Sequence, residues 1–336
     1  MEGLSYFMVV SVLLGGLLFM PFVSETSQAA PIVIRASHDS VTTSPWHLGM
    51  VRFAELVEKK SNGNLKVQIY PPGQLSQSNI RTTIELTQGG SLHCALFSTD
   101  FYQPFDKRFM VFGAPFLFAD RAKTYRALDG PIGRKMFGFF EEKGIKGLAY
   151  WDHGYRQITN SKRPIKKPED IRGLKIRVPL SPLKTEIFKA LGATTSPIPM
   201  GELYMALQQK LVDGQENPFN TIYRRSFQEV QKYITEWNFE YGPLLAVMNL
   251  PFFQSLTPEY QRILISAAEE TSPYQRNLSA SEDDEMKKKL VAAGMELTTL
   301  NQEQLSAFMK AVEPAYAYLE SQVGKELLQE FRNALK

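Results

Sequence analysis

Two arginines and one asparagine stand where their side chains could bind an anion. Arg177 lies near the carboxyl end of an expected strand, just before Pro179, and this end of an open α/β sheet is where ligands bind. A guanidinium there can grip a carboxylate through a pair of parallel hydrogen bonds. Arg156 stands near the start of another expected strand, and Asn217 lies in a turn-rich stretch and offers both a donor and an acceptor. Taken singly, each also fits a structural role, as a surface or salt-bridged arginine or a turn-forming Asn-Pro.

The usual signatures of catalysis are missing from the sequence. It contains no GxSxG elbow, no HExxH pair, no GxGxxG loop and no GxxxxGK[ST] phosphate loop. Residues 181–184 match SxxK, but the SDN and KTG motifs that accompany it in lactamase-type sites are absent. We therefore expect no catalytic residues, although a missing motif does not by itself exclude an enzyme.

Metal-ligand spacing is also missing. The four histidines are scattered, with no pair spaced four residues apart on one helix. The acidic run 282–285 precedes Lys287–Lys289 at a spacing of four, which is typical of a solvated helix face. Cys94 is the single cysteine, which excludes an intramolecular disulfide and multi-cysteine metal sites, and its apolar surroundings predict a buried, inert thiol. We expect neither a metal nor a cofactor.

Length and composition describe an ordinary globular chain. The 336 residues predict about two domains. With 43% hydrophobic and 22% charged residues, the composition excludes disorder, collagen-like repeats and a polytopic membrane protein. The net charge of +3 is too small to indicate a nucleic-acid partner.

The first thirty residues indicate export. Tyr6–Val23 is uncharged and largely apolar, and Ser24–Ala30 is polar and small, which predicts a signal peptide at 1–30 and a mature chain starting near Pro31. No basic residue precedes Arg35, so a retained membrane anchor stays open as the alternative. In both cases the rest of the chain is exported from the cytoplasm. A single cysteine favours a periplasmic protein over a secreted domain that is held together by disulfides.

The elements that would position these residues begin with a β-α-β-α-β series. Hydrophobic patterning and caps predict strands at 32–36, 65–70 and 94–98, with helices at 45–60 and 79–88 between them. This order predicts a parallel or mixed sheet with helices on both faces.

A second series follows. We expect strands at 146–151, 155–159, 174–178 and 244–250, and helices within 121–143, at 181–191 and at 201–209. A helical region follows Thr257, and Pro273 should kink or interrupt it. Asn301 begins a last helical region, with Pro314 as a further kink site.

Several of these segments resemble a known family. GLKIRVP at 173–179, GELYMALQQ at 201–209 and VDGQENP at 212–218 resemble the substrate-binding proteins of tripartite ATP-independent periplasmic (TRAP) transporters. Three further segments resemble the dicarboxylate-type branch of this family, namely WDHGYR at 151–156, YPPGQL at 70–75 and GAPFLF at 113–118. The match runs from about residue 32 to 336, and so many ordered motifs make a specific signal.

The resemblance implies an α/β, periplasmic-binding-protein-like fold, with two α/β lobes, a ligand cleft between them and a long connecting helix. We expect the first lobe to contain 31–153 plus about 243–282, and the second 154–242 plus about 283–336. The implied function is to close on an organic acid and deliver it to the small and large membrane subunits of a TRAP permease. Four-carbon dicarboxylates are the leading ligand class, and sugar acids, keto or hydroxy acids and aromatic acids stay open. We expect the protein to be a monomer.

The resemblance also assigns roles to residues. Arg177 would be the main carboxylate clamp, Arg156 a second guanidinium on the ligand, and Asn217 a partner that orients the carboxylate. Met200 stands where related sequences often carry an aromatic, which gives a softer wall. The lower-ranked candidates, for which a structural role is as reasonable, are Phe219, His38, Asp39, Ser98, Thr99 and Trp151.

Two other functions stay open at this point. An exported enzyme acting on a small organic acid would need a general base with a perturbed pKa in the cleft. A ligand-sensing module would dock on a membrane receptor instead of a permease, and the sequence does not separate these two partners.

Overall fold

The computed structural model describes residues 1, 30–70, 74–75 and 79–336. The signal peptide expected at 1–30 therefore lies, apart from its end residues, outside the described part of the chain. Residues 31–336 form one compact unit. Within the described ranges, no helix is both long and apolar enough to cross a membrane.

The described residues contain one mixed sheet with the strand order β2-β1-β3-β8-β4-β7-β5-β6, and β9 pairs with β8. The strands are β1 Ile32–His38, β2 Leu65–Tyr70, β3 Cys94–Ser98, β4 Ile145–Asn160, β5 Lys175–Val178, β6 Thr194–Pro197, β7 Gly214–Asn217, β8 Tyr233–Asn249 and β9 Glu296–Thr299. β1 lies parallel to both β2 and β3, as the expected series of strands and helices requires.

Two long antiparallel strands, β4 and β8, belong to both halves of this sheet. The last part of β8 pairs with β3, where Met248 opposes Cys94, and its first part pairs with β9. The last part of β4 pairs with β7, where Gln157 opposes Asn217. One half is thus built on β1 to β3 and the other on β5 to β7, which confirms the predicted fold of two α/β lobes.

The strands predicted at 146–151 and 155–159 are a single strand, so that prediction is wrong in detail. Residues 152–154 stay within β4, and the pairing with β8 shifts register between Asp152 and Tyr155. A bulge of this kind takes up extra residues without ending a strand.

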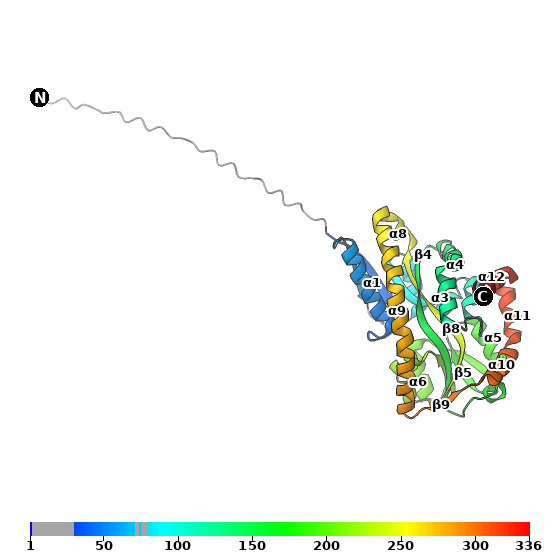
Figure 1. The fold of residues 1–336 in the computed structure, drawn as a ribbon. Helices are drawn as coiled ribbons and strands as arrows, with labels where there is room; N and C mark the ends of the chain where they lie inside the picture. The colour runs from blue at the N-terminus through cyan, green and yellow to red at the C-terminus, as the bar shows by residue number, and fades with distance from the viewer. Residues whose placement is uncertain (2–29, 71–73, 76–78) are drawn as a thin grey trace. The chain divides into compact units, whose positions relative to one another are not determined.

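Helices flank the sheet (Figure 1). They are α1 Pro45–Lys60, α2 Ile80–Gln88, α3 Arg121–Asp129, α4 Pro131–Glu141, α5 Pro182–Ala190, α6 Leu203–Gln208, α7 Phe219–Arg224, α8 Leu250–Ser255, α9 Pro258–Ala292, α10 Gln302–Ala311, α11 Glu313–Val323 and α12 Lys325–Ala334. Short 3-10 helices are η1 Thr99–Tyr102, η2 Lys107–Gly113, η3 Pro168–Ile171, η4 Met200–Glu202 and η5 Phe227–Glu229.

The long connecting helix is α9, which runs beside α1 and β4 (Figure 1). The interruption expected at Pro273 does not occur, because α9 continues through this residue for 35 residues in all. Tertiary contacts hold the helix there. The Gln275 side chain accepts from the Asp152 amide at 2.7 Å and donates to the Asp152 carbonyl at 2.8 Å. These bonds outweigh the helix-breaking preference of one proline.

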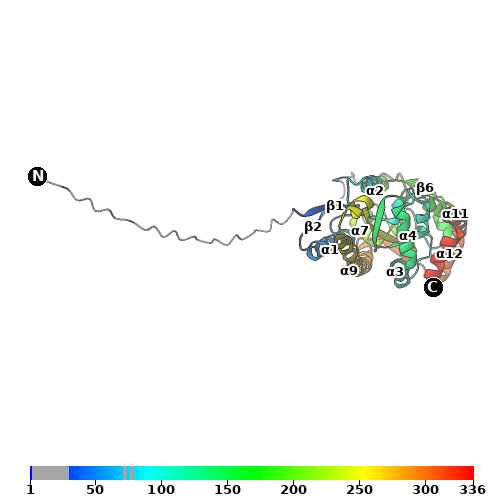
Figure 2. The ribbon, with the colours of Figure 1, turned by 90° about the horizontal axis from the view of Figure 1, so that it is seen from above.

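The last helical region divides into α10, α11 and α12, with Pro314 in the first turn of α11. Phe331 of α12 packs edge-on against Phe112 and Phe118, at ring-centroid distances of 5.5 and 5.8 Å. The Tyr316 hydroxyl donates to the Pro115 carbonyl at 2.6 Å. The C-terminal helices therefore contact elements of the first lobe, and Figure 2 shows α11 and α12 at the edge of the molecule opposite α1.

Candidate functional site

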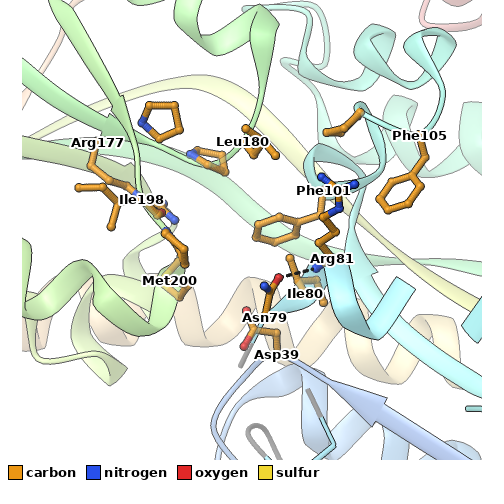
Figure 3. Close-up of a pocket in the computed structure, with 14 residues that line it drawn as sticks. Asp39, Asn79, Ile80, Arg81, Phe101, Phe105, Arg177, Leu180, Ile198 and Met200 are labelled. Atoms are coloured by element: carbon orange, nitrogen blue, oxygen red, sulfur yellow. Dashed lines mark hydrogen bonds between the residues drawn. The ribbon is translucent and has the colours of Figure 1, made fainter. Parts of the chain in front are cut away.

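A cavity of about 240 Å³ lies between segments of the two lobes (Figure 3). The loops after β1 and β3 and the start of α2 form one wall, and the segments after β5 and β6 form the other. Most of its lining is apolar: Ile80, Phe101, Pro104, Phe105, Pro179, Leu180, Pro197, Ile198, Pro199 and Met200. Its polar lining residues are Asp39, Asn79, Arg81 and Arg177.

Arg177 is the buried cation of this cavity. It lies in β5 between the parallel strands β6 and β7, and only 1% of it is exposed. Its Nε donates to the Ile198 carbonyl at 2.8 Å, whereas Nη1 and Nη2 have no hydrogen-bond partner in the protein. Burial lowers the pKa of Arg177 to about 10, so the guanidinium is still charged at neutral pH. Its two unpartnered nitrogens match the geometry of a bidentate carboxylate.

Arg156 and Asn217 lie close together on β4 and β7 but do not line the cavity. Arg156 forms an ion pair with Glu216 and donates to the Glu216 carbonyl at 2.8 Å and to Asn217 Oδ1 at 3.1 Å. The Asn217 amide in turn donates to Gln215 at 2.5 Å. Burial opposes the charge of Arg156, but the charges of Glu216 and Asp100 outweigh it and raise the pKa of Arg156.

Arg156 is part of a buried charge cluster, which we define as Asp100, Arg156, Lys184, Glu216 and Glu240. Lys184 Nζ lies 2.5 Å from Glu240 and 3.3 Å from Asp100, and Arg156 lies 3.7 Å from Asp100. Burial, with Asp100 nearby, raises the pKa of Glu240. The cluster joins η1, α5, β4, β7 and β8, so it fixes the strands beside Arg177.

Asp39 is the acidic residue of the cavity and directly follows β1. It is 9% exposed, and its Oδ1 has no hydrogen-bond partner. Arg225 Nη2 donates to the Asp39 carbonyl at 3.1 Å and lies 4.0 Å from Oδ1. Burial raises the pKa of Asp39 to about 6, against the opposing effect of Arg225 and Arg177. A smaller cavity of about 30 Å³ shares Asp39, Phe101 and Met200 with the first.

Met200, the expected wall residue, and Asp39, one of the lower-ranked candidates, thus line the cavities together with Arg177. The others lie in packing or capping positions. His38 is buried and its Nε2 lies 2.9 Å from His47 Nδ1, and its burial beside His47 lowers its pKa to about 3. The Trp151 indole donates to the Ala268 carbonyl at 3.2 Å.

Ser98, Thr99 and Phe219 are buried as well. The Ser98 hydroxyl accepts from the Asp100 amide at 3.4 Å at the start of η1. Phe219 belongs to an apolar cluster that contains Leu203 and Leu290. Neither cavity is lined by Ser98, Thr99 or Phe219.

Sequence reasoning missed the paired arginines 224 and 225. Arg224 donates to Thr43 at 2.7 Å and pairs with Glu282 at 2.8 Å, and it lines the smaller cavity together with Arg225. Two consecutive arginines one short helix after Asn217 were the available signal. Among the described residues, no group of three or more His, Cys, Asp and Glu side chains is arranged to hold a metal ion.

A two-lobed α/β fold with a buried arginine whose two Nη atoms are unpartnered at a cavity between the lobes is typical of a solute-binding protein. The chain belongs to the family of bacterial extracellular solute-binding proteins, family 7, whose model it matches over residues 36–322.

Relatives that are named for their ligands bind different acids. The chain is 34% identical to the 2,3-diketo-L-gulonate-binding periplasmic protein YiaO of Escherichia coli, over 82% of this chain and 83% of that protein. It is 30% identical to the C4-dicarboxylate-binding periplasmic protein DctP of Rhodobacter capsulatus, over 95% of this chain and 96% of that protein.

Similar proteins of known structure also hold different organic acids. The sugar acid binding protein DctPAm of Advenella mimigardefordensis, in complex with galactonate, has a TM-score of 0.87 at 33% identity, covering 91% of this chain and 98% of that one. A TRAP solute-binding protein of Sulfurospirillum deleyianum with bound succinate has a TM-score of 0.84 at 30% identity, covering 91% and 100%. The chain is accordingly a solute-binding component of a TRAP transporter and not an enzyme, in a family that is periplasmic and works with membrane permease subunits.

Proposed function

We propose that this protein captures an organic carboxylate between its lobes, with Arg177 as the clamp, and delivers it to the small and large subunits of a TRAP permease. The observation that carries the proposal is the pair of Arg177 Nη atoms, buried at the cavity without a partner in the protein. A buried guanidinium with free donors is costly unless an anion pairs with it, and a carboxylate supplies both the charge and the geometry.

Arg156 and Asn217 support this clamp in our proposal. In the sheet β7 lies between β4 and β5, and Arg177 is opposite Gln215 in the β5–β7 pairing. Because Arg156 is already paired with Glu216, its contact with the ligand would be a second role, added to that of holding Asn217 in place. Met200 and Asp39 would line the ligand, and His38, Ser98, Thr99, Trp151 and Phe219 would support the walls.

The expected lobe boundaries at 153/154 and 242/243 are part of the proposal. They coincide with the register shift in β4 and with Gly154, whose φ of +103° favours glycine. A β-carbon on Gly154 would lie 2.7 Å from Asp283 Oδ2. We place the hinge here, in a monomer whose mature chain starts near Pro31.

A thermal-shift screen of the chain from Pro31 onward against a panel of organic acids tests the function, with calorimetry on each hit. A ligand of micromolar affinity present at millimolar concentration should stabilise the native state by about 4 kcal/mol. The bound acid should be recovered unchanged, as expected of a carrier.

Arg177→Ala should weaken binding of the hit by at least about tenfold, because truncating one partner of a buried charge pair costs about 2–5 kcal/mol. The matched control is Arg81→Ala, since Arg81 lines the same cavity but is exposed and pairs with Glu85 at 2.9 Å. The control should retain most of the affinity. Equal losses in both variants, or no acid bound at all, would contradict the clamp.

A further inference from the structure

We propose that the ligand is a hydroxylated monocarboxylate, a hydroxy acid or sugar acid, whose hydroxyl group donates to Asp39 while its carboxylate pairs with Arg177. The inference rests on the proposed function, because it needs Arg177 to hold the carboxylate. It narrows the ligand class away from dicarboxylates.

The free polar atoms of the cavities define this chemistry. Among the described residues that line them, the buried polar side-chain atoms without a partner belong to Arg177, Asp39 and His153. Arg177 supplies two donors and Asp39 Oδ1 one acceptor. His153 Nδ1 lies 3.4 Å from the position that a β-carbon on Gly242 would occupy. This nitrogen therefore faces the backbone at Gly242, and we do not count it among the atoms offered to the ligand. A ligand that satisfies the cavity therefore carries one carboxylate and at least one donor.

Of the other arginines that line the cavities, Arg224 and Arg81 are already paired with carboxylates, and Arg225 faces the Asp39 carboxylate. Arg225 donates to the Asp39 carbonyl and lies 4.0 Å from the Asp39 carboxylate. Arg224 pairs with Glu282 at 2.8 Å, and Arg81 pairs with Glu85 at 2.9 Å.

Asp39 also opposes a second carboxylate directly. An ionised carboxylate only accepts hydrogen bonds, so two of them facing each other leave both without a donor and add like-charge repulsion. A hydroxyl group supplies the missing proton and carries no charge. Asp39 thus favours one ligand class and penalises the other, the combination from which specificity is usually built.

The test compares succinate with D-erythronate, because both contain four carbons and differ in the second carboxylate and the hydroxyl groups. Calorimetry uses the protein purified from the periplasm, at pH 8, where Asp39 is ionised. We expect the wild-type protein to bind D-erythronate, or a longer aldonate such as galactonate, at least about tenfold more tightly than succinate.

Asp39→Asn should narrow this ratio by about fivefold or more, since the amide removes the repulsion and offers N–H donors to a second carboxylate. Glu55→Gln is the matched control. It removes one negative charge from the exposed Arg52–Glu55 pair, whose residues line neither cavity, and should leave the ratio unchanged.

Succinate binding as tightly as the aldonates, or a ratio that Asp39→Asn does not change, would overturn the inference. If Arg177→Ala still abolishes succinate binding in that case, the proposed carboxylate function stands while the ligand class fails. If neither succinate nor any aldonate binds, the ligand class fails, and the proposed carboxylate function fails with it only if no acid of the thermal-shift panel binds. The wild-type comparison needs no variant, so the inference can be rejected even if Asp39→Asn does not fold.

Discussion

Arg177 and Arg156 are both almost completely buried, but their charges are treated differently. Arg156 is surrounded by Glu216 and Asp100, which raise its pKa, whereas burial lowers the pKa of Arg177 to about 10. Buried carboxylates therefore lie beside Arg156, whereas the Nη donors of Arg177 have no partner in the protein. At the scale of single residues, this contrast distinguishes a paired buried arginine from one whose Nη donors have no partner in the protein.

We expect Arg156→Ala to lower the free energy of unfolding by about 3–5 kcal/mol, because breaking a buried ion pair leaves its partners uncompensated. Glu216 would lose its ion pair with Arg156 and two side-chain hydrogen bonds, and would keep only Lys184 Nζ, at 3.5 Å. Arg177→Ala is the comparison, since its guanidinium makes one hydrogen bond to the protein, to the Ile198 carbonyl.

Urea denaturation of both variants without ligand measures this difference. Arg156→Ala should unfold at the lower urea concentration of the two. The assignment of Arg156 to structure would be wrong if Arg177→Ala were the less stable variant.

At the scale of elements, the secondary structure was predicted correctly where it follows from the local residue pattern. The prediction was wrong where neighbouring strands determine the conformation. The strand and helix at 32–36 and 45–60 follow from buried positions and from the Ser44 cap, which accepts from the His47 amide at 3.4 Å. By contrast β7, GQEN, is polar throughout and was interpreted as a turn-rich stretch. It is a strand because β4 and β5 lie on either side and supply its hydrogen bonds.

Pro273 offers a test at this scale. We expect Pro273→Ala to raise the free energy of unfolding, by up to about 3 kcal/mol, because proline is that much less favourable than alanine inside a helix. Both Pro273 and the adjacent Tyr274 are exposed in α9, so Tyr274→Ala is the matched control. The control should change stability by less than about 0.5 kcal/mol, as exposed substitutions usually do.

Thermal and urea unfolding of the two variants give the answer. A loss of stability in Pro273→Ala alone would mean that the packing of α9 against β4 requires the proline.

At the scale of the whole molecule, the C-terminal helices contribute to the core of the first lobe. The largest apolar cluster contains Phe112 and Phe118 together with Phe188, Trp237 and Phe331, and so draws on both lobes and on α12. Residues 283–336, which we expected in the second lobe, therefore also pack on the first.

Phe331→Ala should cost about 3–5 kcal/mol of stability, as is usual for a fully buried phenylalanine. Glu330→Ala, one residue away, breaks an exposed ion pair of 2.8 Å with Lys135 of α4 and should cost at most about 1 kcal/mol. Chemical denaturation compares the two. Similar small losses would show that α12 does not contribute to the core.

The sequence by itself determined the α/β class, the family motifs and the importance of Arg177, because these depend on residue types and local spacing. Only the tertiary structure showed that Arg156 is paired with carboxylates while the Nη atoms of Arg177 are not, and only it brought Asp39 and Arg225 together from positions 186 residues apart. Whether a charged group is paired depends on what the fold places around it, and residues far apart in the chain become partners only when the sheet and lobes assemble. The ligand-facing chemistry of the cleft is accordingly a property of the fold, built from residues that the sequence presents separately.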